Sequence, residues 1–98
     1  MPFQQEKDLK RLDELLANLG GSDDPGKRSA GPCGLLLERL RVARRNLLGS
    51  MLAEYVFSLE QSEKSVACIL DKDARSRART ILRSLIESGA SRYSGRPL

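Results

Sequence analysis

The chain has 98 residues, enough for one small domain with a modest core. A hydrophobic fraction of 40% excludes a wholly disordered protein, and an aromatic fraction of 4% favours helices packed on helices over sheets. The net charge of +4 permits an anionic partner without requiring one. We therefore predict an all-α protein, a small helical bundle of three to four helices with a long central helix, for which pairing of two copies is an open alternative.

The residues that usually carry catalysis are scarce. There is no histidine, which removes the commonest general base and the commonest metal ligand. The sequence contains no glycine-rich nucleotide-binding motif and no serine nucleophile motif. We predict a protein that is not an enzyme and that has no cofactor, no metal site and no small-molecule substrate.

The two cysteines are Cys33 and Cys68. They could form one disulfide, but their spacing is not that of a disulfide framework, and we expect two reduced thiols in an intracellular protein, cytoplasmic or nuclear. The first ten residues, MPFQQEKDLK, lack the apolar region of a signal peptide. No run of 18 apolar residues occurs, so we expect no transmembrane segment.

An amphipathic helix is predicted over residues 4–19, within an N-terminal unit of residues 1–19. Its apolar face consists of Leu9, Leu12, Leu15, Leu16 and Leu19. The segment from Leu12 to Leu16 also has an LxxLL pattern, which can insert into a coactivator groove. A packed helix produces the same pattern, and we favour that interpretation.

Residues 20–34, GGSDDPGKRSAGPCG, have no apolar period and predict a flexible, exposed linker. The helical core domain is expected over residues 35–90. Residues 91–98 are polar and are expected to form a disordered tail.

The most apolar stretch runs from residue 35 to residue 70 and contains no proline. Two apolar seams in it are offset by one residue near Gly49 and Ser50, and we expect a straight helix to accommodate the offset as one broad apolar face. A continuous helix would be roughly 55 Å long. That is too long for a small globule, so we expect either a break near residues 60–64 or pairing with a second chain.

A last helix is predicted over residues 71–88. Asp71 or Asp73 is the expected N-cap, and Gly89 is expected to end the helix. Its apolar face consists of Ala74, Ala78, Ile81, Leu82, Leu85 and Ile86.

The arginines form two groups, one at the start of the central stretch and one stepping by four along the last helix. Such rows are either solvated faces with local ion pairs or sites for an acidic partner. Local pairing is expected between Glu38 and Arg41 and between Arg83 and Glu87.

The central apolar face is wider than two amphipathic helices can cover. We therefore predict a non-enzymatic protein–protein interaction module, an adaptor or a small subunit of a larger complex, that binds another protein or a second copy of itself. The alternative is a nucleic-acid-associated helical protein whose arginines contact the phosphate backbone. The residues expected to bind a partner are Leu36, Leu40, Leu47, Leu48, Leu52, Tyr55, Leu59, Arg41, Arg44, Arg45, Arg75, Arg79 and Arg83.

Overall fold

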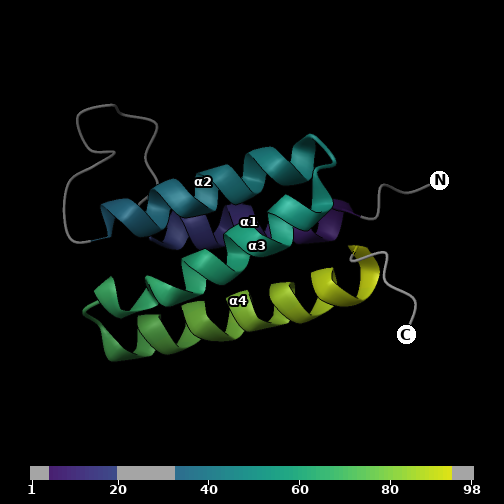
Figure 1. Cartoon of the computed structure of the whole chain (residues 1–98). Coiled ribbons are helices and arrows are strands. Elements are labelled where there is room, and N and C mark those ends of the chain that lie inside the picture. The colour runs from purple at the N-terminus through teal and green to yellow at the C-terminus, as the bar shows by residue number, and fades with distance from the viewer. Residues whose placement is uncertain (1–4, 20–32, 94–98) are drawn as a thin grey trace.

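A computed structural model describes residues 5–19 and 33–93 of the chain. These residues form α1 (Gln5–Asn18), α2 (Gly34–Leu48), α3 (Leu52–Lys64), a 3-10 turn η1 (Val66–Cys68) and α4 (Lys72–Tyr93), shown in Figure 1. No strand occurs in the described parts of the chain. The predicted small all-α bundle is confirmed. Most of the predicted linker lies outside the described residues, and α2 already begins at its last residue, Gly34.

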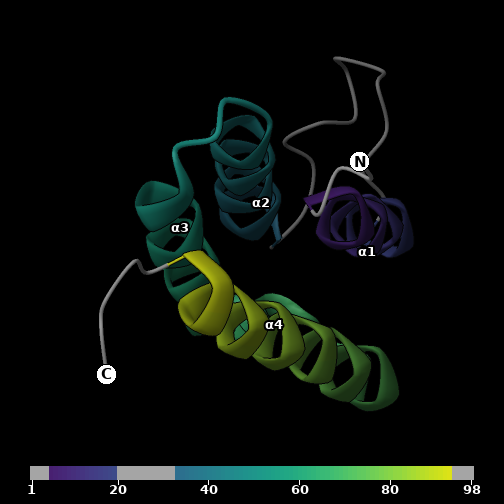
Figure 2. The ribbon, with the colours of Figure 1, turned by 90° about the vertical axis from the view of Figure 1, so that its right-hand side faces the viewer.

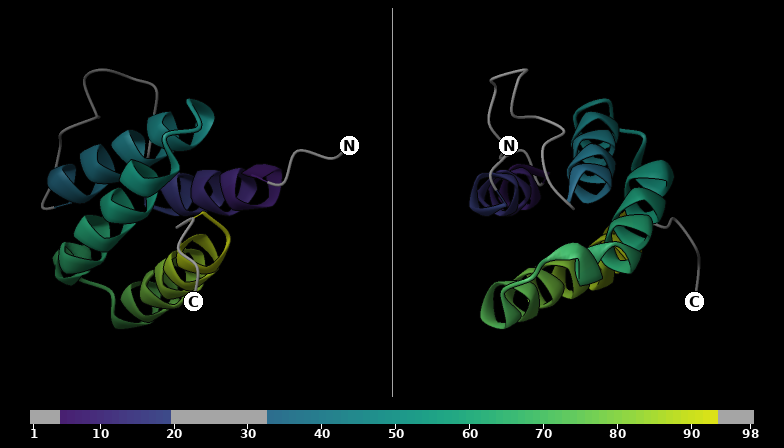
Figure 3. Two further views of the ribbon diagram at one scale, coloured as in Figure 1. Left: turned by 45° about the vertical axis from the view of Figure 1, so that its right-hand side comes forward. Right: turned by 90° about the vertical axis from the view of Figure 1, so that its left-hand side faces the viewer.

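The four helices pack around one shared core. Helices α2 and α3 form a hairpin, α4 packs against α3, and α1 contacts both α2 and α4. Figures 2 and 3 show that α1 lies on the side of α2 opposite to α3. One face of α2 is thereby turned away from the other helices.

The core consists mainly of leucines contributed by all four helices. Leu12 and Leu15 of α1, and Leu82 and Leu85 of α4, are at most 2% exposed. Burial of each such side chain stabilises the fold by about 1.5–3 kcal/mol. The other core residues, all buried, are Leu36, Leu40, Ala43, Leu47, Tyr55, Leu59, Val66, Ile69, Ala78 and Ile86.

The expected straight helix through Gly49 and Ser50 is wrong, because the chain turns there. The amide of Met51 donates to the carbonyl oxygen of Asn46 at 2.9 Å, and the amide of Ser50 donates to that of Leu47 at 3.2 Å. These are the two hydrogen bonds of a Schellman helix end. Ser50, with φ of 57°, takes the left-handed conformation that glycine usually supplies.

The expected interruption near residues 60–64 corresponds to the end of α3 at Lys64. The amide of Ser65 donates to the carbonyl oxygen of Ser62 at 2.9 Å, and the chain then tightens into η1. The predicted central helix is therefore two helices and a 3-10 turn. Folding it back on itself lets one copy of the chain bury most of its apolar surface.

The prediction of two reduced thiols is wrong for this structure. Cys33 and Cys68 form a disulfide, with their Cα atoms 5.3 Å apart. Cys33 immediately precedes α2, and Cys68 is the last residue of η1. The α2–α3 hairpin brings these two positions together although 35 residues separate them. The bond closes the open end of the hairpin.

Helix α4 starts as predicted and ends later than predicted. A carboxylate oxygen of Asp71 accepts the amide of Ala74 at 2.8 Å, so Asp71 is the N-cap. Gly89 does not end the helix, which continues to Tyr93 and includes the first three residues of the expected tail. Gly89 is buried, and a Cβ atom there would lie 2.9 Å from Cγ2 of Val56. Glycine at position 89 therefore lets α4 pack closely against α3.

The conformation of Ser50 predicts opposite effects for two substitutions. Ser50→Gly should stabilise the protein by about 0.5–1 kcal/mol, because glycine takes the left-handed conformation without steric cost. Ser50→Val should destabilise it by about 1 kcal/mol or more, since a β-branched residue is poorly tolerated there. Denaturant unfolding measures both. Ser76→Gly, on the exposed face of α4, is the matched control and should be destabilising. Equal responses at positions 50 and 76 would contradict this assignment.

The disulfide predicts a strong effect of reduction. In the chain-entropy account, a cross-link across 35 residues stabilises a fold by about 3–4 kcal/mol. Reductant should therefore lower the Tm by roughly 10 °C or more, and Cys33→Ser/Cys68→Ser should show the same lower Tm with and without reductant. Alkylation before and after reduction, followed by mass spectrometry, counts the thiols. Two thiols that react in the unreduced folded protein would refute the bond.

Candidate interaction surface

The leucine-rich face expected to bind a partner lies mostly inside this chain. Its members Leu36, Leu40, Leu47, Tyr55 and Leu59 are each 0% exposed. Leu52 is half-buried, and Leu48 is exposed. The five buried side chains have no free surface for a partner in this conformation, because the other helices of the same chain cover them. A partner-binding surface in this conformation must therefore consist of other, exposed residues.

Five large hydrophobic side chains of the described residues remain exposed: Leu35, Leu48, Met51, Phe57 and Leu70. Leu48 and Met51 flank the turn between α2 and α3, and Leu70 precedes α4. Leu35 and Phe57 lie on the helices of the hairpin, and each is more than half exposed. Scattered apolar side chains need no explanation, so their arrangement decides whether they form a site.

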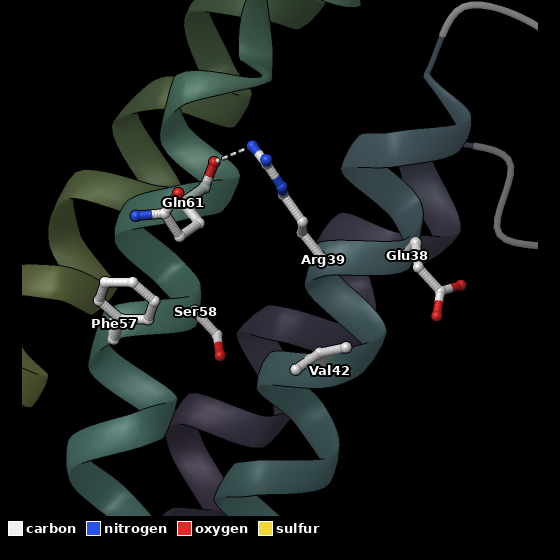
Figure 4. A pocket seen from close by; sticks show the side chains of 6 residues that line it. All are labelled: Glu38, Arg39, Val42, Phe57, Ser58 and Gln61. Carbon is white, nitrogen blue, oxygen red and sulfur yellow. Dashed lines mark hydrogen bonds between the residues drawn. The ribbon is translucent and has the colours of Figure 1, made fainter.

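A groove of about 230 Å³ runs between α2 and α3 on the outside of the hairpin. Figure 4 shows Glu38, Arg39 and Val42 on its α2 side and Phe57, Ser58 and Gln61 on its α3 side. Leu35 is two helical turns before Val42 and shares its face of α2. Together, Leu35, Val42 and Phe57 form the apolar part of this surface, which we call the hairpin surface.

Polar contacts between the helices hold the groove in shape. The side-chain amide of Asn46 donates to the hydroxyl of Ser58 at 3.0 Å, and that hydroxyl donates to the carbonyl oxygen of Glu54 at 2.7 Å. Arg39 reaches across to α3, where its guanidinium donates to the carbonyl oxygen of Gln61 at 2.9 Å and to the hydroxyl of Ser65 at 2.7 Å. The small Ser58 side chain leaves the groove open beside the outward-pointing Phe57.

Four of the six arginines assigned to a phosphate backbone contact groups of this chain. Arg44 pairs with Asp13 of α1 at 2.7 Å, and Arg75 donates to the carbonyl oxygen of Ile69 at 3.0 Å. The expected pairs are present as long contacts, Arg41 with Glu38 and Arg83 with Glu87, each at 3.9 Å. Arg83 also contacts Glu63 of α3 at 3.3 Å. These arginines therefore tie helices together or pair locally.

Arg45 and Arg79 are exposed and have no ion pair among the described residues. Arg45 lies on α2 at the edge of the hairpin surface. Arg79 lines a polar hollow of about 560 Å³ along α4, together with Ser76, Thr80, Arg83, Ser84 and Glu87. Arg45 and Arg79 lie on different helices and therefore do not form one continuous basic row.

A buried polar cluster joins the start of α1 to the end of α4. Asp8 is 2% exposed, and its carboxylate accepts a hydrogen bond from the hydroxyl of Tyr93 at 2.7 Å while Arg92 lies 4.0 Å away. The Tyr93 ring packs against Tyr55, with centroids 6.0 Å apart. Burial, with the Asp8 charge nearby, raises the pKa of Tyr55 far above its usual range. This cluster anchors α1, and among the described residues two further side-chain hydrogen bonds, Arg44 to Asp13 and Arg11 to Ser84, join α1 to α2 and α4.

The LxxLL segment of α1 serves the core. Leu12 and Leu15 are buried, and Leu16 is half-buried against the same cluster. A coactivator groove would need these leucines exposed. The packed-helix interpretation is therefore confirmed in this structure.

Within residues 5–19 and 33–93, no group of three or more potential ligands is placed to hold a metal ion. None of the helices described there combines the length and the apolar character needed to cross a membrane. The chain matches no known protein family, no curated protein and no solved structure in the comparisons made. The arrangement of its own residues therefore carries the functional argument.

The sequence contains one signal for the hairpin surface, the spacing of two apolar residues in the first part of the central stretch. Leu35 and Val42 are seven residues apart and lie off the main leucine seam of α2. Phe57 lies in the apolar stretch of residues 35–70, and its outward direction follows only from the turn at Gly49–Met51. The groove could not be predicted without that turn.

Tyr93 predicts a specific pH dependence of stability. Burial and the hydrogen bond to Asp8 raise the pKa of Tyr93 from 10.0 to about 12. The folded protein therefore holds this proton more tightly than the unfolded chain, and the contribution is complete below pH 10 and is lost as pH rises toward 12. Tyr93→Phe should cost about 1–3 kcal/mol at neutral pH and should reduce the fall in stability between these pH values.

Denaturant unfolding at pH 7, 10, 11 and 12 measures this effect. Phenylalanine keeps the ring contact with Tyr55, so the comparison isolates the hydroxyl. Parallel pH curves for the two proteins would show that the Tyr93 hydroxyl does not interact with Asp8.

Proposed function

We propose that this chain is a non-enzymatic helical protein–protein interaction module, an adaptor or a small subunit of a larger complex. The observation that carries the proposal is the hairpin surface, where Leu35 and Phe57 are 58% and 59% exposed beside the half-buried Val42. Most of the other described leucines lie in the core or pack against it. Aromatic and aliphatic side chains at a shallow groove are typical anchors of protein interfaces.

The polar residues around the hairpin surface support a protein partner. Glu38 and Arg45 border it with opposite charges, and Arg39 is held against α3 at its edge. An apolar centre with a charged rim is the usual composition of a protein interface. A phosphate backbone would instead favour cations alone, because each acidic group repels it.

The nucleic-acid alternative has less support, since Arg44, Arg75 and Arg83 already contact groups of this chain. It is tested by the salt dependence of retention on a polyanion column. Phosphate neutralisation predicts a steep slope that becomes shallower in Arg45→Ala/Arg79→Ala.

A cytoplasmic or nuclear location stays a prediction. The Cys33–Cys68 disulfide counts against it, because disulfides persist mainly in oxidising compartments. Trapping the thiols by alkylation at the moment of cell lysis would report their state in the cell.

The proposal predicts that a charge at Phe57 abolishes partner binding. Phe57→Asp should remove the captured partner from an affinity purification of the full chain, because a carboxylate would be buried without a counter-charge. Stability should change by less than about 0.5 kcal/mol, since Phe57 is exposed. Thr80→Asp, on the exposed face of α4, is the matched control and should retain the partner. If the natural chain, Phe57→Asp and Thr80→Asp all capture the same proteins, the hairpin surface is not the binding site.

A further inference from the structure

The outward face of α2 has a pattern that fits an antiparallel copy of itself. Glu38 and Arg45 are seven residues apart and therefore lie on the same face, two helical turns from each other. Both are exposed, and they carry opposite charges. Their midpoint is next to Val42, the half-buried apolar residue of the hairpin surface.

We propose that two copies of this chain pair through their hairpin surfaces, with the two α2 helices antiparallel about a two-fold axis near Val42. This inference rests on the proposed function and names the partner of that surface as a second copy. A two-fold axis makes every contact occur twice, so the surface must be complementary to itself.

Charge complementarity follows directly from this arrangement. Glu38 and Arg45 each lie about 5 Å along the helix from the midpoint, on opposite sides of it. Reversing the helix direction in the second copy therefore places Glu38 level with Arg45 of that copy, and Arg45 level with its Glu38. A parallel pairing would instead set like charges against each other, which is unfavourable.

Neither charge is committed to a strong partner within the chain. Glu38 has a side chain that is 62% exposed, and its contact with Arg41 is long, at 3.9 Å. Exposed pairs of this kind contribute little to stability. Arg45 has no ion pair among the described residues. Both side chains can therefore turn to a second copy.

The apolar residues match under the same symmetry. Leu35 lies near the start of α2, and Leu48, the last residue of α2 and the neighbour of Gly49, lies equally far on the other side of the midpoint of Glu38 and Arg45. The methyl carbon of Met51 would be 3.9 Å from a Cβ atom at Gly49, so the Met51 side chain lies beside this exposed position. Antiparallel pairing places Leu35 against the Gly49–Met51 turn of the second copy. It also buries Val42 at the axis, with Phe57 at the side of the contact.

Sedimentation of the purified full chain between about 1 and 500 μM tests the pairing. The expected result is a monomer–dimer equilibrium with a dimer at the upper concentrations. Glu38→Arg and Arg45→Glu should each weaken dimerisation at least tenfold, because each creates two like-charge contacts. The double variant Glu38→Arg/Arg45→Glu should restore dimerisation to within about threefold of the natural chain. Circular dichroism confirms that each variant is folded.

A chain that stays monomeric throughout this range overturns the inference. So does a dimer that responds to neither single variant, or one that the double variant fails to restore. A monomeric chain that still loses a captured protein on Phe57→Asp would overturn the self-pairing and leave the proposed interaction module in place. If Phe57→Asp retains the captured protein and also the dimer, both the self-pairing and the proposed interaction module are overturned.

Discussion

The turn at Gly49–Met51 is the constraint on which the rest of this structure depends. It folds the most apolar stretch of the chain into a hairpin, so that α2 covers one side of α3 and leaves the other side for α4. Without the turn, a single long helix would expose more leucines than two further helices can cover. The Schellman hydrogen bonds from Met51 and Ser50 hold the turn although glycine is absent from its left-handed position.

The disulfide and the polar contacts between helices form around this hairpin. The disulfide between Cys33 and Cys68 closes its open end. Asp8 and Tyr93 join the first helix to the last at the opposite end of α1 from its connection to α2. Arg44 and Arg83 bind carboxylates on neighbouring helices, so residues that look like a basic recognition row also hold helices together. Arginine suits this use because its guanidinium reaches far and makes several hydrogen bonds.

The same hairpin creates the surface on which the functional proposals rest. Its inner faces become core, while its outer faces carry the exposed Leu35 and Phe57, and the half-buried Val42 lines the groove together with Phe57. Helix α1 covers a different side of α2, so none of the other described helices covers the outward face (Figure 2). This surface exists because the four described helices pack with their apolar faces toward one core, and none of them covers the outer side of the α2–α3 hairpin.

The sequence by itself determined the all-α class, the first helix, the two candidate N-caps of α4 and its apolar face, because each depends on local periodicity or on one capping side chain. The turn at Gly49–Met51 was missed because no glycine occupies its left-handed position, and two other missed features depend on contacts between distant residues. The disulfide requires Cys33 and Cys68 to meet, and the passage of α4 through Gly89 requires Val56 to lie against it. The sorting of leucines in residues 35–70 into core and surface was decided only by the tertiary structure, because the apolar face of this stretch is broad and packing selects the part of it that is buried.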